Sequence, residues 1–286
     1  MEIDSRFPSK LDSVSDAPEP LRSAVAENCP SSESVRLVVH APAFSTVDER
    51  SPATVLAVTD SGWVVASETE EGSTSTEKSN FSDTLFLELT SILLSGQLRI
   101  CFASVGTSYS VTIKFDTVGE EFYREAIDLM LNGIDQTVVA RSENGGDAAS
   151  IFETWPMKFR IEAERYRPRG QRLLAATQWP AIFGGFEREL APAGALLVIE
   201  RELVLIAEEK ASPRQHSGDL HEFGGIVTYF PLVRLTDFHV SHHERFGILA
   251  LQVHATHGGE KLEIIFPSDH ERVVSEAMDR RVLRKG

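Results

Sequence analysis

Cysteine is scarce in this chain of 286 residues, which contains only Cys29 and Cys101. A disulfide-stabilised secreted scaffold is therefore excluded, because such folds depend on several cross-links. Long apolar runs are missing too, and no stretch approaches the ~20 apolar residues that span a bilayer. Residues 1–16 are acidic and serine-rich and lack the apolar centre of a secretory signal. We therefore expect a cytoplasmic protein with reduced thiols.

Basic residues are outnumbered, since 28 Lys and Arg stand against 43 Asp and Glu and give a net charge of −15. This balance argues against a nucleic-acid binder and against a general binder of anionic membranes. The charge is unevenly divided: residues 1–140 hold 9 basic and 22 acidic residues, whereas residues 141–286 hold 19 and 21. The two halves therefore present different surfaces.

An internal repeat organises the sequence. A shift of 138 positions aligns residues 18–50 with 156–188 and matches seven identical residues. Further along, the best shift rises to 140, 146, 148 and 151, and each increase falls at an expected turn, where insertions are tolerated. The pattern predicts a flexible tail at 1–17, a first unit at 18–134, a linker at 135–155 and a homologous second unit at 156–286.

Both units show the same order of elements by hydrophobic periodicity and turn residues. The first is predicted to contain a helix over 20–28, strands over 35–40, 55–58, 63–67, 85–92, 98–105 and 109–115, and a closing helix over 122–130. The second is predicted to contain a helix over 156–166, strands over 173–178, 196–199, 203–207, 229–240, 247–254 and 261–266, and a closing helix over 273–278. Residues 68–83, which are acidic and rich in Ser and Thr, are predicted to form a long loop.

About six antiparallel strands closed by one helix resemble the pleckstrin-homology-like (PH-like) superfold, especially its bacterial PH-like and GRAM-like branch. The resemblance implies a mainly β, α+β fold of two tandem split-barrel units, each an antiparallel meander capped by its C-terminal helix. It also implies that loops between the strands bind phosphoinositides, peptides or proteins. The helix before the first strand and the acidic first unit depart from the pattern of a lipid-binding PH domain.

Histidines gather in the second unit, where His239, His242, His254 and His257 suggest a metal site. The two members of each close pair are three positions apart, so they do not share a face of one strand. No cysteine lies nearby, and the sequence has no His-Glu-x-x-His motif. We therefore predict no bound metal and expect histidines on surface turns, with a metal-dependent enzyme as a remaining alternative.

Carboxylates recur near the closing helices, as Glu120, Glu125 and Asp128 and again as their copies 151 positions later. Their repetition favours a structural role at the helix start, where a negative charge is stabilised by the helix dipole. No Gly-x-Ser-x-Gly motif and no phosphate-binding glycine loop is present. We therefore predict neither enzymatic activity nor a cofactor.

The candidate binding residues are basic or aromatic and lie in the second unit. They are Arg160, Arg167, Arg169, Arg172, Arg188, Lys210, Arg214, His216 and Trp179. Arginines can dock an acidic peptide or a lipid head group. The alternatives are a solvated helix face or a partner for the acidic first unit, and packing rather than ligand stacking for Trp179.

These observations favour a non-enzymatic interaction module whose partner is a protein or a peptide. A peripheral lipid binder acting through the second unit, with weak contact to a membrane, is the next alternative. A metal-dependent enzyme that uses the histidines is the third.

Overall fold

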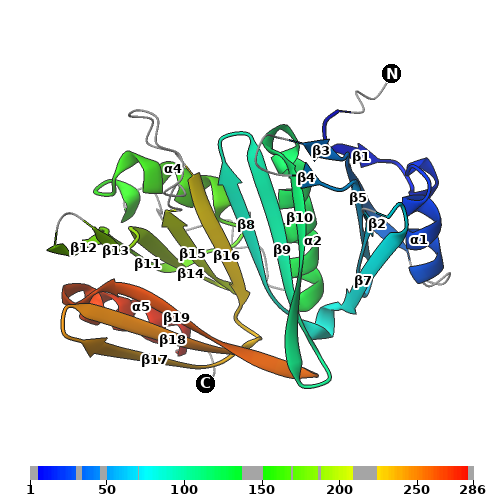
Figure 1. The fold of residues 1–286 in the computed structure, drawn as a ribbon. Helices are drawn as coiled ribbons and strands as arrows, with labels where there is room; N and C mark the ends of the chain where they lie inside the picture. Colours follow the sequence, from blue (N-terminus) through cyan, green and yellow to red (C-terminus); the bar gives the residue numbers. More distant parts are fainter. Residues whose placement is uncertain are drawn as a thin grey trace. The chain divides into compact units, whose positions relative to one another are not determined.

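The computed structural model describes residues 6–29, 34–45, 50–69, 71–136, 151–168, 170–185, 188–208 and 224–282. These residues form a mainly β, α+β structure with four α-helices (Figure 1). Their strands lie in several sheets, and none of these sheets closes into a barrel. Among the same residues, no helix combines the length and the apolar character needed to cross a bilayer.

The chain divides into two compact units. The first unit comprises Met1–Gln136, and the turn at Ala255–Gly258 is grouped with it. The second unit comprises Thr137–His254 and Gly259–Gly286. The predicted linker at 135–155 falls largely outside the described residues.

The first unit contains two helices and ten strands among its described residues. In chain order they are β1 (Ser9–Leu11), α1 (Leu21–Asn28), β2 (Val35–Ala41), β3 (Phe44–Ser45), β4 (Arg50–Ser51), β5 (Thr54–Thr59), β6 (Gly62–Glu68), β7 (Thr74–Asn80), β8 (Thr84–Ile92), β9 (Ser95–Ser104), β10 (Thr107–Asp116) and α2 (Glu120–Ile134). Short 3-10 turns lie at Val14–Asp16, Phe81–Asp83 and Thr117–Gly119. One sheet has the order β1-β2-β5-β6-β7, and β8, β9 and β10 form an antiparallel meander.

Strand β5 is buried along its whole length because helices cover both faces of its sheet. Helix α1 contacts β5, β6 and β7, while α2 contacts β2, β5 and β6 (Figure 1). Val55 and Ala57 belong to the apolar cluster under α1. Because side chains alternate along a strand, Leu56 and Val58 face the α2 side. The continuous apolar run Val55–Val58 therefore serves two cores.

Two parts of the first unit differ from the sequence prediction. Residues assigned to a flexible tail form β1, which pairs with β2, and Leu11 and Ala17 are buried in the cluster under α1. The predicted loop at 68–83 is wrong, because it contains β7, which pairs with β6 along its length. Strand β7 is polar on both faces, so it shows no apolar alternation that the sequence analysis could detect.

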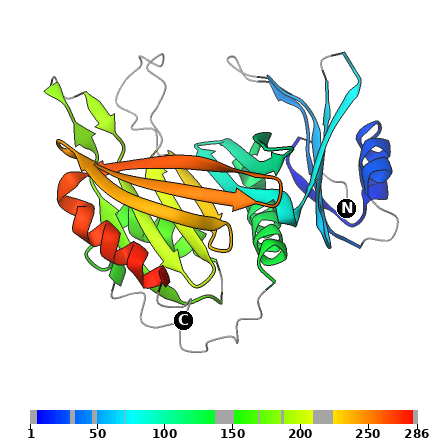
Figure 2. The same ribbon diagram turned by 90° about the horizontal axis from the view of Figure 1, so that it is seen from below.

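From its first helix onwards, the described part of the second unit repeats this order of elements, without a counterpart of β1. They are α4 (Met157–Tyr166), β11 (Leu173–Trp179), β12 (Ile182–Phe183), β13 (Glu189–Ala191), β14 (Gly194–Ile199), β15 (Glu202–Glu208), β16 (Gly224–Pro231), β17 (Leu235–His243), β18 (Phe246–Ala255), β19 (Gly258–Pro267) and α5 (Glu271–Val282). Strands β11, β14, β15 and β16 are adjacent in one sheet, and β17, β18 and β19 form another (Figure 2). Helix α5 contacts strands of both sheets. The single strand predicted at 229–240 is wrong, since a turn after Pro231 separates β16 from β17.

The repeat extends to strand register and to irregularities within the strands. The register of β2 against β5 has an irregularity between Val35 and Leu37. The register of β11 against β14 has one between Leu173 and Ala175, 138 positions later. A second irregularity lies between Thr84 and Phe86 in the pairing of β8 with β9. Its counterpart lies 151 positions later, between Leu235 and Asp237, in the pairing of β17 with β18. Such bulges are specific features of a strand pair, so their recurrence marks equivalent positions.

The registers also correct the alignment of the two units. Strand β10 and the turn and helix after it all match the second unit at a shift of 151, and so do the bulges of β8 and β17. Gly62 of β6 pairs with Asn80 of β7, and Glu202 of β15, 140 positions after Gly62, pairs with Pro231 of β16, 151 positions after Asn80. The alignment shift therefore rises from 140 to 151 between β6 and β7, which corresponds to the segment between β15 and β16. The intermediate shifts of 146 and 148 are therefore wrong.

A phenylalanine lies against a glycine in each meander. Phe115 on β10 lies opposite Gly96 on β9, and a Cβ added at Gly96 would overlap with the phenyl ring. Gly247 and Phe266, each 151 positions later, have the same relation. Phe115 also stacks on Tyr123 of α2, with ring centroids 3.8 Å apart. The glycine thus lets the ring reach both the meander and the closing helix.

We expect Gly96→Ala and Gly247→Ala each to destabilise their unit by about 1–3 kcal/mol, because the added methyl group overpacks the core. The measurement is the midpoint of urea unfolding, followed by tryptophan fluorescence and far-UV circular dichroism. Gly185→Ala is the control, since a Cβ there would have no atom within 4 Å. Equal midpoints for Gly96→Ala and Gly185→Ala would contradict the packing role.

Candidate functional site

The predicted basic residues do not form one described cluster. Arg160 lies on α4, Arg167 caps that helix, Arg172 precedes β11 and Arg188 precedes β13. Arg169, Lys210, Arg214 and His216 lie outside the described residues. Arg172 contacts Glu200 of its own unit, and the first unit has an equivalent contact between a turn and a strand.

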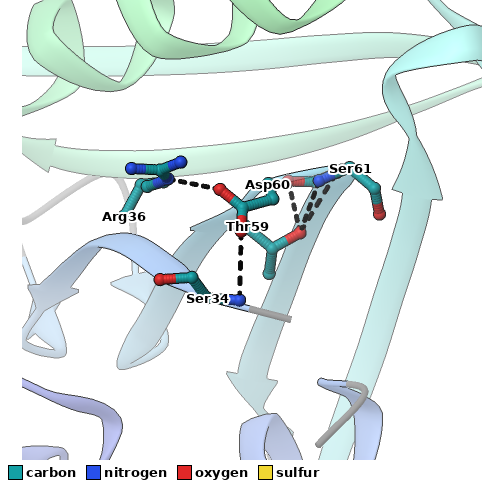
Figure 3. Close-up of polar contacts among 6 residues, drawn as sticks. Ser34, Arg36, Thr59, Asp60 and Ser61 are labelled. Carbon is teal, nitrogen blue, oxygen red and sulfur yellow. Dashed lines mark hydrogen bonds and ion pairs between the residues drawn. The ribbon is translucent and has the colours of Figure 1, made fainter. Parts of the chain in front are cut away.

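In the first unit, the turn between β5 and β6 is tied to the start of β2 (Figure 3). The Asp60 carboxylate accepts a hydrogen bond from the backbone N–H of Ser34 at 3.2 Å and forms an ion pair with Arg36. Asp60 N–H donates in return to Ser34 O at 3.1 Å. Within the turn, Thr59 Oγ1 accepts from Gly62 N–H at 3.1 Å. We call the contacts between Ser34, Arg36 and Asp60 the turn clasp.

The second unit has an equivalent clasp made by Arg172 and Glu200. Glu200 corresponds to Asp60, and Arg172 corresponds to Ser34. The Glu200 carboxylate accepts from Arg172 N–H at 3.4 Å, and its Oε1 lies 3.6 Å from Arg172 Nε. Glu200 N–H donates to Arg172 O at 3.2 Å. Arg172 therefore holds a turn of its own unit.

The basic residue Lys158 on α4 also has partners within its own unit. Lys158 Nζ lies 3.2 Å from Glu208 Oε1 and donates to Gly224 O at 3.2 Å, which ties α4 to β15 and β16. Glu162 lies beside them, and burial raises the pKa of its carboxyl group above the usual value. Within the described part of the chain, Glu162 Oε2 has no hydrogen-bond partner.

Trp179 is a core residue. It is 2% exposed, its ring centroid lies 5.8 Å from that of Phe266, and its indole lies against Gly194. This burial gives Trp179 a packing role and removes its faces from ligands.

The four histidines of the suggested metal site lie on the surface, and two helix-start carboxylates of the first unit have partners within that unit. His239, His242 and His254 are exposed, and His242 lies 3.0 Å from Glu271 at the start of α5. No three metal-ligating side chains come together within the described ranges. Glu120 is buried and accepts a hydrogen bond from Ser91, whereas Glu125 pairs with Lys10.

An apolar cavity of about 340 Å³ lies in the first unit and was missed by the sequence analysis. We call it the first-unit hollow. Its lining consists of Arg6, Pro8, Pro42, Phe44, Ser45, Leu94, Ser95, Phe115 and Asp116. These residues come from the N-terminal segment, the segment after β2 that includes β3, the β8–β9 turn with the start of β9, and the end of β10. The buried Phe115 is the residue that also contacts Gly96 and Tyr123.

Exposed apolar side chains lie at or near this hollow in the sequence, since Leu94 lines it, Leu93 precedes Leu94 and Val118 follows the lining residue Asp116 by two positions. Leu93 and Leu94 form the turn between β8 and β9 and are 65% and 72% exposed, and Val118 is 64% exposed. Thr117 fixes the turn, since its N–H donates to Leu94 O at 3.1 Å and its hydroxyl donates to Leu93 O at 2.9 Å. We call Leu93 and Leu94 the dileucine turn.

The second unit carries different side chains at the same positions. Glu244 and Arg245 occupy the turn between β17 and β18, 151 positions after the dileucine turn. Leu93 and Glu244 share a left-handed backbone, with φ of 52° and 57°, so the backbone conformation belongs to the turn itself. At this turn, therefore, the exposed leucine pair occurs in the first unit and is replaced by two charged residues in the second.

Two residues that line the hollow are smaller than the residues at the equivalent positions of the second unit. Phe183 corresponds to Ser45 and Phe246 corresponds to Ser95, at shifts of 138 and 151. In the second unit, Arg245 Nη1 donates to Phe183 O at 3.2 Å and joins the two segments. A leucine at this position cannot make that bond. The sequence contains this signal, but the incorrect shifts of 146 and 148 hid it by pairing the dileucine turn with the wrong residues.

We expect Arg172→Ala to cost about 1–3 kcal/mol of unfolding free energy, because the Glu200 side chain is 3% exposed and loses a charged donor. Arg36→Ala is the matched variant in the first unit. It should cost only about 0–1 kcal/mol, because Asp60 stays 40% exposed to water. Urea unfolding measures both, and a larger loss for Arg36→Ala would contradict this account.

We expect Glu162→Gln to stabilise the second unit near pH 7. A carboxyl whose pKa is raised on folding contributes stability below its unfolded pKa and loses it as the pH rises through the folded pKa. The glutamine removes the buried charge, so its advantage should appear at pH 7 and fade towards pH 4. Thermal unfolding at both pH values measures the difference. An advantage independent of pH would contradict the burial of a charged carboxylate.

The sequence matches no model of a known protein family, and no curated protein matches it. The candidate site therefore rests on the comparison between the two units of this chain.

Proposed function

We propose that the chain is a cytoplasmic, non-enzymatic interaction module of two tandem PH-like units that binds a protein or peptide through its first unit. The order of the strands supports the PH-like assignment. Strands β2, β5, β6 and β7 are adjacent in one sheet, a three-stranded meander follows, and α2 closes the unit. The second unit has the same four-plus-three arrangement, closed by α5.

The dileucine turn beside the first-unit hollow is the observation that carries this proposal. Two leucines at a hairpin tip expose apolar surface to water, although the equivalent turn in the second unit is charged. Contiguous exposed apolar surface beside a concave site is typical of an interaction surface. The binding residues are therefore assigned to the first unit instead of the arginines of the second.

The alternatives receive less support. A lipid site in the second unit would use Arg188, Lys210, Arg214 and His216, and of these only Arg188 lies within the described residues. Two other basic residues of this unit are already paired, Arg172 with Glu200 and Lys158 with Glu208. The first unit is a poor surface for an anionic membrane, since residues 1–140 carry 9 basic and 22 acidic residues. A metal-dependent enzyme has no described group of ligands to build on.

The double variant Leu93→Glu with Leu94→Arg tests the assignment. It gives the first unit the turn residues that the second unit already carries on the same backbone, so the fold should be kept. Burying a leucine contributes about 1.5–3 kcal/mol, and we expect the variant to bind its partner more than about tenfold more weakly. The partner is recovered by affinity capture from the native host, and the affinities are compared by calorimetry.

The reciprocal variant, Glu244→Leu with Arg245→Leu, is the matched control. It changes the charge and apolar area of the second unit by the same groups, and it should leave partner affinity unchanged. Equal affinities for the first-unit variant and the unmodified protein, or a loss confined to the second-unit variant, would place the interaction elsewhere.

A further inference from the structure

The first-unit hollow has a shape and a lining that select among peptide partners. We propose that it binds the phenyl ring of a phenylalanine in an extended peptide, flanked by a basic residue. This inference rests on the proposed function and adds the chemistry of the bound segment. Its support comes from the second unit, from the walls of the hollow and from charge.

The second unit carries aromatic side chains at two of the equivalent positions. At the two places where the first unit has Ser45 and Ser95, the second unit has Phe183 and Phe246. Phe183 is 54% exposed, whereas Phe246 is half-buried, so the serine at position 95 removes a half-buried ring that the second unit carries at the equivalent position. The cavity of about 340 Å³ lies within the size range of ligand sites, which starts at ~300 Å³. A ring from a partner would restore what the first unit lacks.

The walls of the hollow suit an aromatic ring. Phe44 and Phe115 supply aromatic surface, and Pro8, Pro42 and Leu94 supply aliphatic surface. Aromatic pairs in stacked or edge-on geometry contribute about 0.5–1.5 kcal/mol beyond their buried area. Phe115 is held between Gly96 and Tyr123 and is therefore already in place before a ligand arrives.

Charge favours a basic residue next to the ring. Arg6 and Asp116 line the hollow and balance each other, so the hollow itself is neutral. Beyond it, the excess of 22 acidic over 9 basic residues in residues 1–140 gives the first unit a negative field. Such a field attracts a positively charged partner and repels a negatively charged one.

The test is a titration of the ¹⁵N-labelled full chain, followed by amide chemical shifts. The probes are N-acetyl-phenylalaninamide, N-acetyl-alaninamide, and the dipeptide amides N-acetyl-Phe-Arg and N-acetyl-Phe-Glu. We expect saturable shifts at Leu94, Ser95 and Phe115 with the phenylalanine probe and none with the alanine probe. The Arg dipeptide should bind several-fold more tightly than the Glu dipeptide at low salt, and less so at high salt.

Two matched variants fill and open the site. Ser95→Phe introduces the phenyl ring that the second unit carries at the equivalent position, Phe246, and it should abolish probe binding while leaving the rest of the spectrum unchanged. Phe246→Ser makes the reverse change and should create a weak phenylalanine site in the second unit. Probe binding that survives in Ser95→Phe, or equal binding of the alanine probe, would overturn the proposal.

Other outcomes separate this inference from the proposed function. Loss of partner binding in the Leu93→Glu, Leu94→Arg variant, combined with no shifts from any phenylalanine probe, would keep the interaction surface and overturn the aromatic specificity. A dimer seen by light scattering that Ser95→Phe converts to a monomer would identify the occupant as a second copy of the chain and also overturn it.

Discussion

The contact between a phenylalanine and a glycine on the neighbouring strand is the constraint on which each unit depends. In the first unit, Phe115 lies against Gly96 and stacks on Tyr123, so one ring joins the meander to the closing helix. The same pair recurs as Phe266 and Gly247. Phe115 also lines the first-unit hollow. The core contact that fixes the fold is therefore the floor of the site through which we propose the protein binds.

Much of the secondary structure could be predicted because apolar periodicity marks elements that face a core. The helix expected at 20–28 is α1, and the hairpin at 55–58 and 63–67 is β5 and β6. Strand β7 was missed because pairing with β6 stabilises it without an apolar face. Strands β16 and β17 were merged because the turn between them, at residues 232–234, begins with Leu and Val.

The candidate site was harder to predict, because sequence shows which residues are charged and not what they contact. Arg172 looked available for a ligand, yet Glu200, which lies 28 residues further along the chain, occupies it. The apolar site of the first unit became visible only after strand registers corrected the alignment and paired Leu93 with Glu244. The two units share the phenylalanine–glycine contact and the positions of their bulges, and they differ at the dileucine turn.

Crystallography of the full chain soaked with N-acetyl-phenylalaninamide tests the central claim most directly. The account predicts a phenyl ring between Phe44, Leu94 and Phe115 in the first unit, with Phe183 and Phe246 at the equivalent positions of the second. A first-unit hollow filled by the chain's own side chains, or a ring bound in the second unit instead, would contradict it.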